Sequence, residues 1–494
     1  MRRSIYLLCL MLVLLYTRCV DDKTNSDFTV LNDIEISGIE ELYIRNIGDS
    51  LVITPTLKFS IEDNHQLSYL WFLSTPQTMY AADTLSSDKN LRIAVKAIPG
   101  EYNLTYKVTD TSTGVFYHCK THIRVDGAYS KGILVLAEND GFAQLNFLPE
   151  QGNFVSGIYE GANQEKIGYN PQRVFFVNPG RKEYKEVFVL CNDERGGVCL
   201  NSDNMQKRTN IRDAFFVPLQ EPLVASNLYF KPKSGTLADY LIIGGKVYNR
   251  SSNMSNEPRF KSALIVDDEE YQMSSWHFSA PSTAWFYDQK NKRFLAHKEA
   301  NKGSLIPFEI GDAGNFDPNN VNLDVICGGF GKAGRPAAIF GLFKESVGND
   351  YYVQIINADI TTYKMDLKDK YSVDDRNHML SASCYEIPRY DYYSYLIFYA
   401  FGSRIYVHNA ETRVTEMLYD FNEEMEGDMQ IDCLEVASKT DLRVGLRNLS
   451  LEGKQGGFVL LKLTELGGLS VDRTINPIVK FGFCDKVIDF DTKQ

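Results

Sequence analysis

The sequence lacks the excess of basic residues that a nucleic-acid-binding surface needs. Its 494 residues carry 52 Lys and Arg against 64 Asp and Glu, which gives a formal net charge of −12. No run of Lys or Arg offsets that balance locally. A phosphate backbone would be repelled by such a chain. We therefore expect no nucleic acid among its partners.

Familiar catalytic and metal-binding motifs are also missing. The chain contains no H-E-x-x-H, no G-x-S-x-G and no Cys-x-x-Cys. His118 and His122 have the spacing of a helical zinc pair, but they lie in a strand-like stretch that would hold them roughly 13 Å apart. The acidic loop 311–320 lacks the glycine and the final glutamate of an EF-hand. We expect no catalytic residue, no metal and no cofactor.

A glycine-rich stretch fits the dinucleotide pattern G-x-G-x-x-G at residues 329–334. A dinucleotide site needs a helix to begin at the last glycine. Here Arg335 and Pro336 follow, and then the strand-like run A-A-I-F-G-L-F. We predict a loop between sheets at these glycines.

Cysteines are few and scattered, which argues against a disulfide framework. Most are expected to be small buried thiols. Cys191 and Cys199 flank N-D-E-R-G-G-V and could instead face each other across a hairpin. Behind Cys19 the chain has seven cysteines: Cys119, Cys191, Cys199, Cys327, Cys384, Cys433 and Cys484.

The N-terminus has a basic start and a twelve-residue apolar run, 5–16, that is too short to span a bilayer. Cys19 follows, and this arrangement resembles the lipobox of bacterial lipoproteins, although Arg18 stands where that family prefers a small residue. The resemblance implies a signal peptide over 1–18, a lipidated Cys19 and an acidic tether over 19–27. Asp21 and Asp22 resemble the export signal of Bacteroidota lipoproteins, which implies the extracellular face of the outer membrane. A plain secretion signal is the alternative.

Residues 28–127 have strand character throughout. Between Pro99 and Gly114, residues 102, 104, 106 and 108 are apolar or aromatic and alternate with polar ones, which predicts a strand with one face on a core. With Trp71 upstream, this pattern resembles the PKD-type immunoglobulin-like sandwich. The resemblance implies that Trp71 lies between two sheets, with Tyr102 and Tyr106 packed nearby.

Residues 128–494 carry a loose repeat of strand–turn–strand units, and helical periodicity is hard to find there. The turns are predicted near residues 140, 194, 245, 289, 355, 402 and 453, a spacing of about 50 residues that is typical of a β-propeller. We predict an all-β protein: the sandwich followed by a propeller of about seven blades, with eight as the alternative. The closing stretch 482–491 is expected to add a strand to the first blade.

Aromatic rings are the candidates for ligand binding, because ring faces commonly hold sugars and peptides. Rings in the turn-like stretch around Pro388 would face solvent, whereas Tyr395, Tyr399 and Trp285 are expected in cores. The candidate ligand-binding residues are Tyr390, Tyr392, Tyr393 and Trp276.

The layout of signal-type cysteine, PKD-like module and long C-terminal part resembles the PKD-like lipoproteins associated with SusC/SusD-type nutrient importers of Bacteroidota. That resemblance implies a non-enzymatic, cell-surface accessory protein that works with a TonB-dependent transporter and with other surface lipoproteins. It would bind or present oligosaccharides or oligopeptides. A propeller-type glycan hydrolase or lyase is the alternative, because a sequence cannot show two carboxyls held across a sugar. A surface adhesin is a further alternative.

Overall fold

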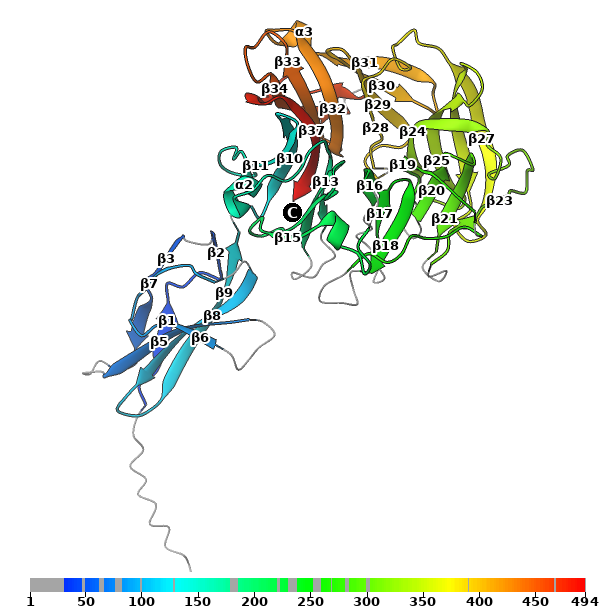
Figure 1. Ribbon diagram of the computed structural model, residues 1–494. Helices are drawn as coiled ribbons and strands as arrows, with labels where there is room; N and C mark the ends of the chain where they lie inside the picture. The colour runs from blue at the N-terminus through cyan, green and yellow to red at the C-terminus, as the bar shows by residue number, and fades with distance from the viewer. Residues whose placement is uncertain are drawn as a thin grey trace, which may run out of the picture. The chain divides into compact units, whose positions relative to one another are not determined.

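The computed structural model (Figure 1) divides the chain into two compact units, Met1–Val125 and Asp126–Gln494. The sequence placed this boundary between residues 127 and 128. The structure describes residues 31–46, 49–61, 66–75, 82–97, 100–127, 129–177, 185–219, 223–229, 238–251, 259–267, 269–279, 284–298, 303–389, 391–465 and 468–493.

Unit 1 consists of strands in two layers around one apolar core. One layer is a five-stranded sheet in the order β2-β9-β8-β5-β6, in which β9, β8, β5 and β6 pair antiparallel, and the pairs β1-β4 and β3-β7 supply the rest. The strands are β1 (Ile34–Ser37), β2 (Leu42–Asn46), β3 (Ser50–Ile53), β4 (Thr56–Phe59), β5 (Leu67–Ser74), β6 (Ala82–Ser86), β7 (Leu91–Ala94), β8 (Gly100–Asp110) and β9 (Phe116–Asp126).

The core of unit 1 centres on Trp71, as predicted. Its side chain is fully buried, its ring stacks on that of Tyr106 at 4.3 Å, and its Nε1 donates to the carbonyl of Asp88 at 3.1 Å. Leu104 and Val108 share the buried face of β8 with Tyr106, so the core face predicted for this strand is confirmed. Its other face is not wholly exposed, because Thr105 is buried as well.

In the described part of unit 2 the strands form seven sheets that follow one another along the chain. All pairings are antiparallel except that of β23 with β27. In chain order the sheets contain β10 (Gly132–Asn139) and β11 (Phe142–Pro149) with β37 (Lys486–Lys493); β12 (Pro171–Val177), β13 (Glu186–Cys191), β14 (Gly197–Asn201) and β15 (Lys207–Asn210); β16 (Ala225–Tyr229), β17 (Ala238–Ile243) and β18 (Lys246–Ser251); β19 (Met273–His277), β20 (Ala284–Asp288), β21 (Arg293–His297) and β22 (Ile306–Pro307); β23 (Glu309–Ile310), β24 (Leu323–Lys332), β25 (Ala337–Glu345), β26 (Tyr351–Ala358) and β27 (Lys364–Val373); β28 (Cys384–Glu386), β29 (Leu396–Phe401), β30 (Arg404–Asn409) and β31 (Val414–Asp420); and β32 (Met429–Ser438), β33 (Asp441–Asn448), β34 (Gly456–Thr464), β35 (Ser470–Val471) and β36 (Ile478–Cys484).

Consecutive sheets of unit 2 pack face to face, and each interface has its own apolar cluster. The seventh sheet packs in turn on the first, where Phe458 meets Val135 and Val487. The chain is therefore nearly all-β, and unit 2 is propeller-like. Its described helices are short: α2 (Ile158–Asn163), α3 (Phe421–Glu424) and the 3₁₀ turn η2 (Ile211–Asp213).

The first and last parts of unit 2 share a sheet. Figure 1 shows the red C-terminal strand β37 beside the teal β10, and the two pair antiparallel from Gly132↔Lys493 to Glu138↔Lys486. The closing strand predicted from the sequence is confirmed from Lys486 onward. Gly482–Cys484 instead belong to β36, which pairs with β34.

Most predicted turns of unit 2 are confirmed, but the one near residue 355 is wrong. Ile355 lies inside β26. The chain turns at residues 359–363, because the Asp359 carboxylate accepts the N–H groups of Thr361 and Thr362 at 2.6 and 2.8 Å. A carboxylate held in this way is a common turn former.

The loop predicted at the glycine-rich stretch is also wrong in part. Gly329 and Gly331 lie within β24, and only Gly334 lies beyond the strand. A Cβ on Gly331 would be 2.7 Å from the ring of Tyr395, and one on Gly329 would be 2.9 Å from Ile387. These glycines therefore make room for the next sheet rather than for a cofactor.

Cys191 and Cys199 do not form the disulfide that the sequence left open, because both thiols are free and buried. Cys199 lies opposite Phe188 in the ladder, and its Sγ donates to Glu186 Oε1 at 3.3 Å. Within the ranges that the structure describes, no helix is long and apolar enough to cross a membrane.

Candidate functional site

The strands at one edge of successive sheets bring a group of ionisable side chains together in unit 2. β37, β12, β16 and β19 contact one another in that order, and β28, β32 and β37 do the same. We call the following set the inner-strand cluster: Arg173, His277, Glu386, Glu435, Asp489 and Asp491. Its members come from five different strands.

Two aspartates of β37 hold the neighbouring strand β12. Asp489 accepts from Arg173 Nη1 at 3.1 Å and from the backbone N–H of Val174 at 2.9 Å. Asp491 accepts the backbone N–H of Phe176. These carboxylates therefore connect the first sheet to the second.

The two glutamates of the cluster are held in the same manner. Glu386 of β28 accepts the backbone N–H of Val436 in β32 at 3.3 Å. Glu435 accepts from Arg443 Nη1 at 2.7 Å, and Arg443 also donates to Thr492 at 2.6 Å. Each hydrogen bond joins two adjacent strands or sheets.

Burial changes the protonation of the cluster. It raises the pKa of Glu386 and that of Asp491 to about 8, and in each case the Glu435 carboxylate adds to the rise. It lowers the pKa of His277 to about 4, with a further contribution from Arg173. Both carboxyl groups are therefore mainly protonated at neutral pH, and the imidazole is neutral.

No metal centre emerges from these residues. Across the described ranges, no group of three or more His, Cys, Asp or Glu side chains is placed to hold a metal ion.

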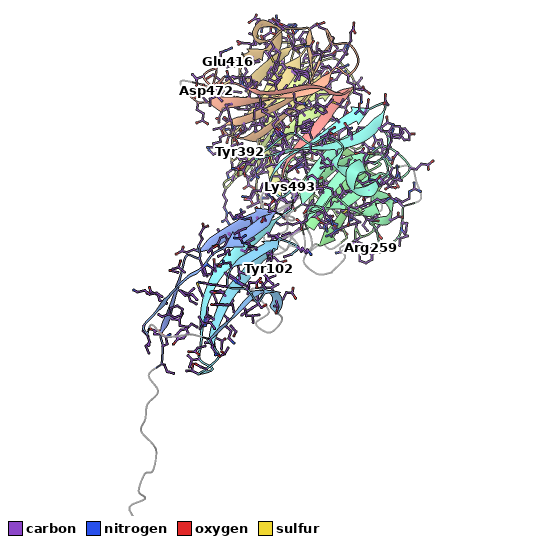
Figure 2. All side chains as sticks on the ribbon, turned by 90° about the vertical axis from the view of Figure 1, so that its left-hand side faces the viewer. Tyr102, Arg259, Tyr392, Glu416, Asp472 and Lys493 are labelled. Carbon is purple, nitrogen blue, oxygen red and sulfur yellow. The ribbon has the colours of Figure 1, made fainter. Side chains whose placement is uncertain are left out.

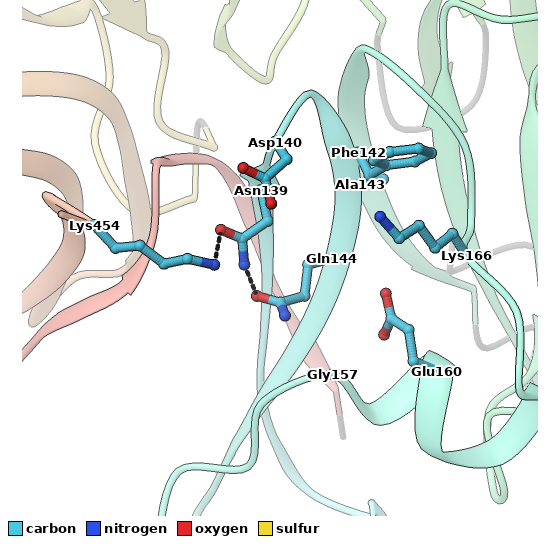
Figure 3. Close-up of a pocket in the computed structure, with 9 residues that line it drawn as sticks. All are labelled: Asn139, Asp140, Phe142, Ala143, Gln144, Gly157, Glu160, Lys166 and Lys454. Carbon is cyan, nitrogen blue, oxygen red and sulfur yellow. Dashed lines mark hydrogen bonds between the residues drawn. The ribbon is translucent and has the colours of Figure 1, made fainter.

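A cavity of about 240 Å³ lies where the β10–β11 turn approaches the β33–β34 turn (Figure 3). We call it the closure pocket. Its lining combines charged, amide and apolar groups: Asn139, Asp140, Phe142, Ala143, Gln144, Gly157, Glu160, Lys166 and Lys454. A larger cavity of about 490 Å³ is lined mainly by apolar residues of the segment between the second and third sheets, of the third sheet and of the loop after it, including Phe215, Leu223 and Tyr248.

Of the residues predicted to bind ligand, Tyr392 and Tyr393 lie in the loop between β28 and β29. Tyr392, labelled in Figure 2, is half-buried, with the Arg389 guanidinium 5.1 Å from its ring centre. The hydroxyl of Tyr393 donates to the carbonyl of Lys439 at 2.5 Å, and its ring packs on the core between the sixth and seventh sheets.

Trp276 is half-buried in β19 and packs on the core between the fifth and sixth sheets. Trp276 and Tyr393 thus belong to different clusters. Tyr395, Tyr399 and Trp285 are buried, as predicted. Cys19, Asp21, Asp22 and Tyr390 lie outside the described residues.

Sequence reasoning missed both the inner-strand cluster and the closure pocket. The strand V-I-D-F-D carried a signal, because Asp489 and Asp491 alternate with apolar residues in a segment expected to close the fold. The sequence around Glu160 gave no such signal, since a single acidic residue in a short helix is common.

The comparison with protein families concerns the first third of the chain. Residues 19–171 match the model of the PKD-like family. The matched segment begins at Cys19, covers the described part of unit 1 and continues through β10, β11 and α2. It contains the whole lining of the closure pocket except Lys454. The sequence matches no curated protein.

Three solved structures show what the whole chain is similar to. One is a quinonprotein alcohol dehydrogenase-like protein from Bacteroides thetaiotaomicron VPI-5482, with 12% identity, a TM-score of 0.41, and 92% of this chain and 95% of that chain covered. The periplasmic gluconolactonase of Pseudomonas aeruginosa is 12% identical with a TM-score of 0.37, and 72% of this chain and 96% of that chain are covered. The WD40 domain of SCAP from fission yeast is 10% identical with a TM-score of 0.31, and 81% of this chain and 96% of that chain are covered. Such values transfer no activity to this chain.

Proposed function

We propose that this chain is a non-enzymatic surface lipoprotein of the outer membrane that serves a SusC/SusD-like importer. It would present oligosaccharides or oligopeptides to a TonB-dependent transporter, alongside other surface lipoproteins. In this proposal unit 1 is a PKD-type sandwich that acts as a spacer, and unit 2 is a seven-bladed propeller that carries the binding surfaces. The observation that carries the proposal is the family match, which begins at Cys19, the residue behind the apolar N-terminal run.

The anchor is tested by replacing Cys19 with alanine. Cys19→Ala should abolish labelling by a fatty-acid probe and release the protein into a soluble fraction, because acyl chains supply the membrane affinity. Cys9→Ala is the matched control, since Cys9 lies inside the signal peptide and should leave labelling unchanged. Retained labelling and membrane association in the Cys19 variant would contradict the proposal.

The partner is tested by affinity purification from detergent-solubilised outer membranes. A tagged chain should return a TonB-dependent transporter, and the recovery should disappear when Asp21 and Asp22 are both replaced by alanine if these residues direct surface export. Recovery of the tagged chain without any transporter would count against the importer association.

A glycan hydrolase or lyase is the second candidate. The observation in its favour is that Glu386 and Asp491, with pKa values of about 8, carry a proton at neutral pH as a general acid must. Against it, both carboxyls accept backbone N–H groups of neighbouring strands, which occupies them structurally. Turnover of a glycan by the purified chain, lost in Glu386→Gln, would favour the enzyme.

A further inference from the structure

The closure pocket has one wall fixed by a relay of hydrogen bonds. Lys454 Nζ donates to Asn139 Oδ1 at 2.5 Å, and Asn139 Nδ2 donates to Gln144 Oε1 at 2.9 Å (Figure 3). Asn139 Nδ2 also donates to the carbonyl of Phe483 at 3.3 Å. Gln144 is thereby held with its carbonyl engaged, so its amide N–H groups are left to donate to a ligand.

Glu160 provides an acceptor on the opposite side. Its carboxylate points toward the head of Lys166 in Figure 3, and Oε2 is buried with no hydrogen-bond partner among the described residues. Burial raises the pKa of this carboxyl, while a hydrogen bond from the backbone N–H of Glu160 and the charge of Lys166 oppose the rise. Glu160 lines the cavity, and its carboxylate can accept a hydrogen bond from a ligand hydroxyl there.

Lys166 is positioned by an aromatic pair. Its Nζ lies 3.5 Å from the centre of the Phe142 ring, and the Phe142 ring lies 4.1 Å from that of Tyr169. This cation–π contact holds the ammonium group at the rim of the cavity. Phe142 and Ala143 give the pocket an apolar side.

The charge and size of the pocket restrict what it can hold. Two lysines are balanced by Glu160 and Asp140, so a charged ligand would leave one of these groups uncompensated. A volume of about 240 Å³ lies below the usual range for drug-sized ligands and fits a single ring unit. The cavity is surrounded by a carboxylate that accepts hydrogen bonds and by amide and ammonium groups that donate them. This combination suits a ligand rich in hydroxyl groups.

We propose that the closure pocket binds one neutral sugar residue, whose hydroxyls donate to Glu160 and accept from Gln144 and Lys166. This inference rests on the proposed function in that it selects glycans over peptides as the presented ligand.

The test measures binding of methyl glycosides to the purified mature chain. A panel of neutral methyl hexopyranosides at millimolar concentration should include at least one ligand seen by saturation-transfer NMR, and that ligand should raise the unfolding temperature of unit 2. Glu160→Ala should weaken its binding by about tenfold or more, since a hydrogen bond to a charged group is lost. Lys166→Met should weaken it as well.

Glu150→Ala is the matched control, because Glu150 is exposed at the end of β11. It should leave the affinity unchanged, and circular dichroism should show that all variants are folded. Absence of glycoside binding, equal binding by Glu160→Ala, or binding only of a dipeptide panel would overturn the inference.

These outcomes are separable from failure of the importer proposal. If transporter recovery succeeds while glycosides fail to bind, the pocket inference alone is wrong. If glycosides bind through Glu160 and no transporter is recovered, the pocket stands and the importer association falls.

Discussion

The two units use charge in different ways. In unit 1 the ion pair of Lys58 and Glu35 lies on the surface, with 81% and 72% of the side chains exposed, and the core is an apolar cluster around Trp71. Unit 2 instead buries Arg250 at 2% exposure between Glu186 and Asp239 and between two phenylalanine rings. Unit 2 therefore buries an ion-pair network, whereas the core of unit 1 is built around apolar and aromatic side chains.

The largest effect relative to total stability is expected from Trp71→Ala. Loss of a fully buried indole should cost unit 1 about 3 to 5 kcal/mol, a large part of the stability of a small domain. Calorimetry should show the transition of unit 1 at a much lower temperature and that of unit 2 unchanged. Phe116→Ala, at a ring that is 55% exposed, is the control. A shift of both transitions would show that the units do not unfold independently.

Arg250→Met should destabilise unit 2 by about 3 to 5 kcal/mol, because two buried carboxylates lose their shared partner. Arg250 Nε lies 2.6 Å from Asp239, and Nη2 lies 2.6 Å from Glu186. The triple variant that adds Glu186→Gln and Asp239→Asn should recover part of the loss in denaturant unfolding. No recovery would mean that packing between the rings, rather than charge, dominates.

The pH dependence of stability should also separate the units. Glu386 and Asp491 have folded pKa values of about 8, well above their ordinary values of 4.5 and 3.8, so the folded state keeps protons that the unfolded chain releases. Between the ordinary and the folded pKa values, unit 2 should lose stability as the pH rises, by up to about 1.4 kcal/mol per pH unit for each carboxyl.

The decisive window is pH 6.5 to 8. Below pH 6.5, the ordinary pKa of histidine, His277 acts in the opposite sense, because burial lowers its pKa to about 4. Glu386→Gln should reduce the slope there. In unit 1 the hydrogen bonds from Ser112 lower the pKa of Asp110, so its stabilisation is complete well below this window. A flat profile for unit 2 would contradict the burial of these acids.

The smallest effect is expected at the exposed ion pair of unit 1. Lys58→Ala should change the free energy of unfolding by less than about 0.5 kcal/mol, because solvent screens the 3.7 Å contact with Glu35. Chemical denaturation of the variant beside wild type measures this. A loss comparable to that of Arg250→Met would remove the distinction between the units.

Local patterns predicted a good part of the fold. Alternation placed the buried face of β8, and turn residues placed six hairpin turns of unit 2, because both depend on neighbours in sequence. The turn predicted near residue 355 was wrong for a related reason: the strand continues to Ala358, and the turn former is the side chain of Asp359.

The sites could not be predicted in the same way. The inner-strand cluster joins Arg173 to Asp489, which are 316 residues apart, and the closure pocket joins Asn139 to Lys454, 315 apart. The glycines of β24 looked like a loop because the rings that need their space come from other sheets. A single sequence shows neither which strands become neighbours nor which acidic side chains become buried away from solvent.

The pairing of β10 with β37 has a consequence for how unit 2 assembles. Until residues 486–493 are available, the first sheet keeps an open edge, and its interface with the seventh sheet lacks Val487 and Phe490. Such long-range pairing makes assembly slow and leaves an edge that other chains can extend. Unit 2 lacking β37 should therefore self-associate more readily than the full chain.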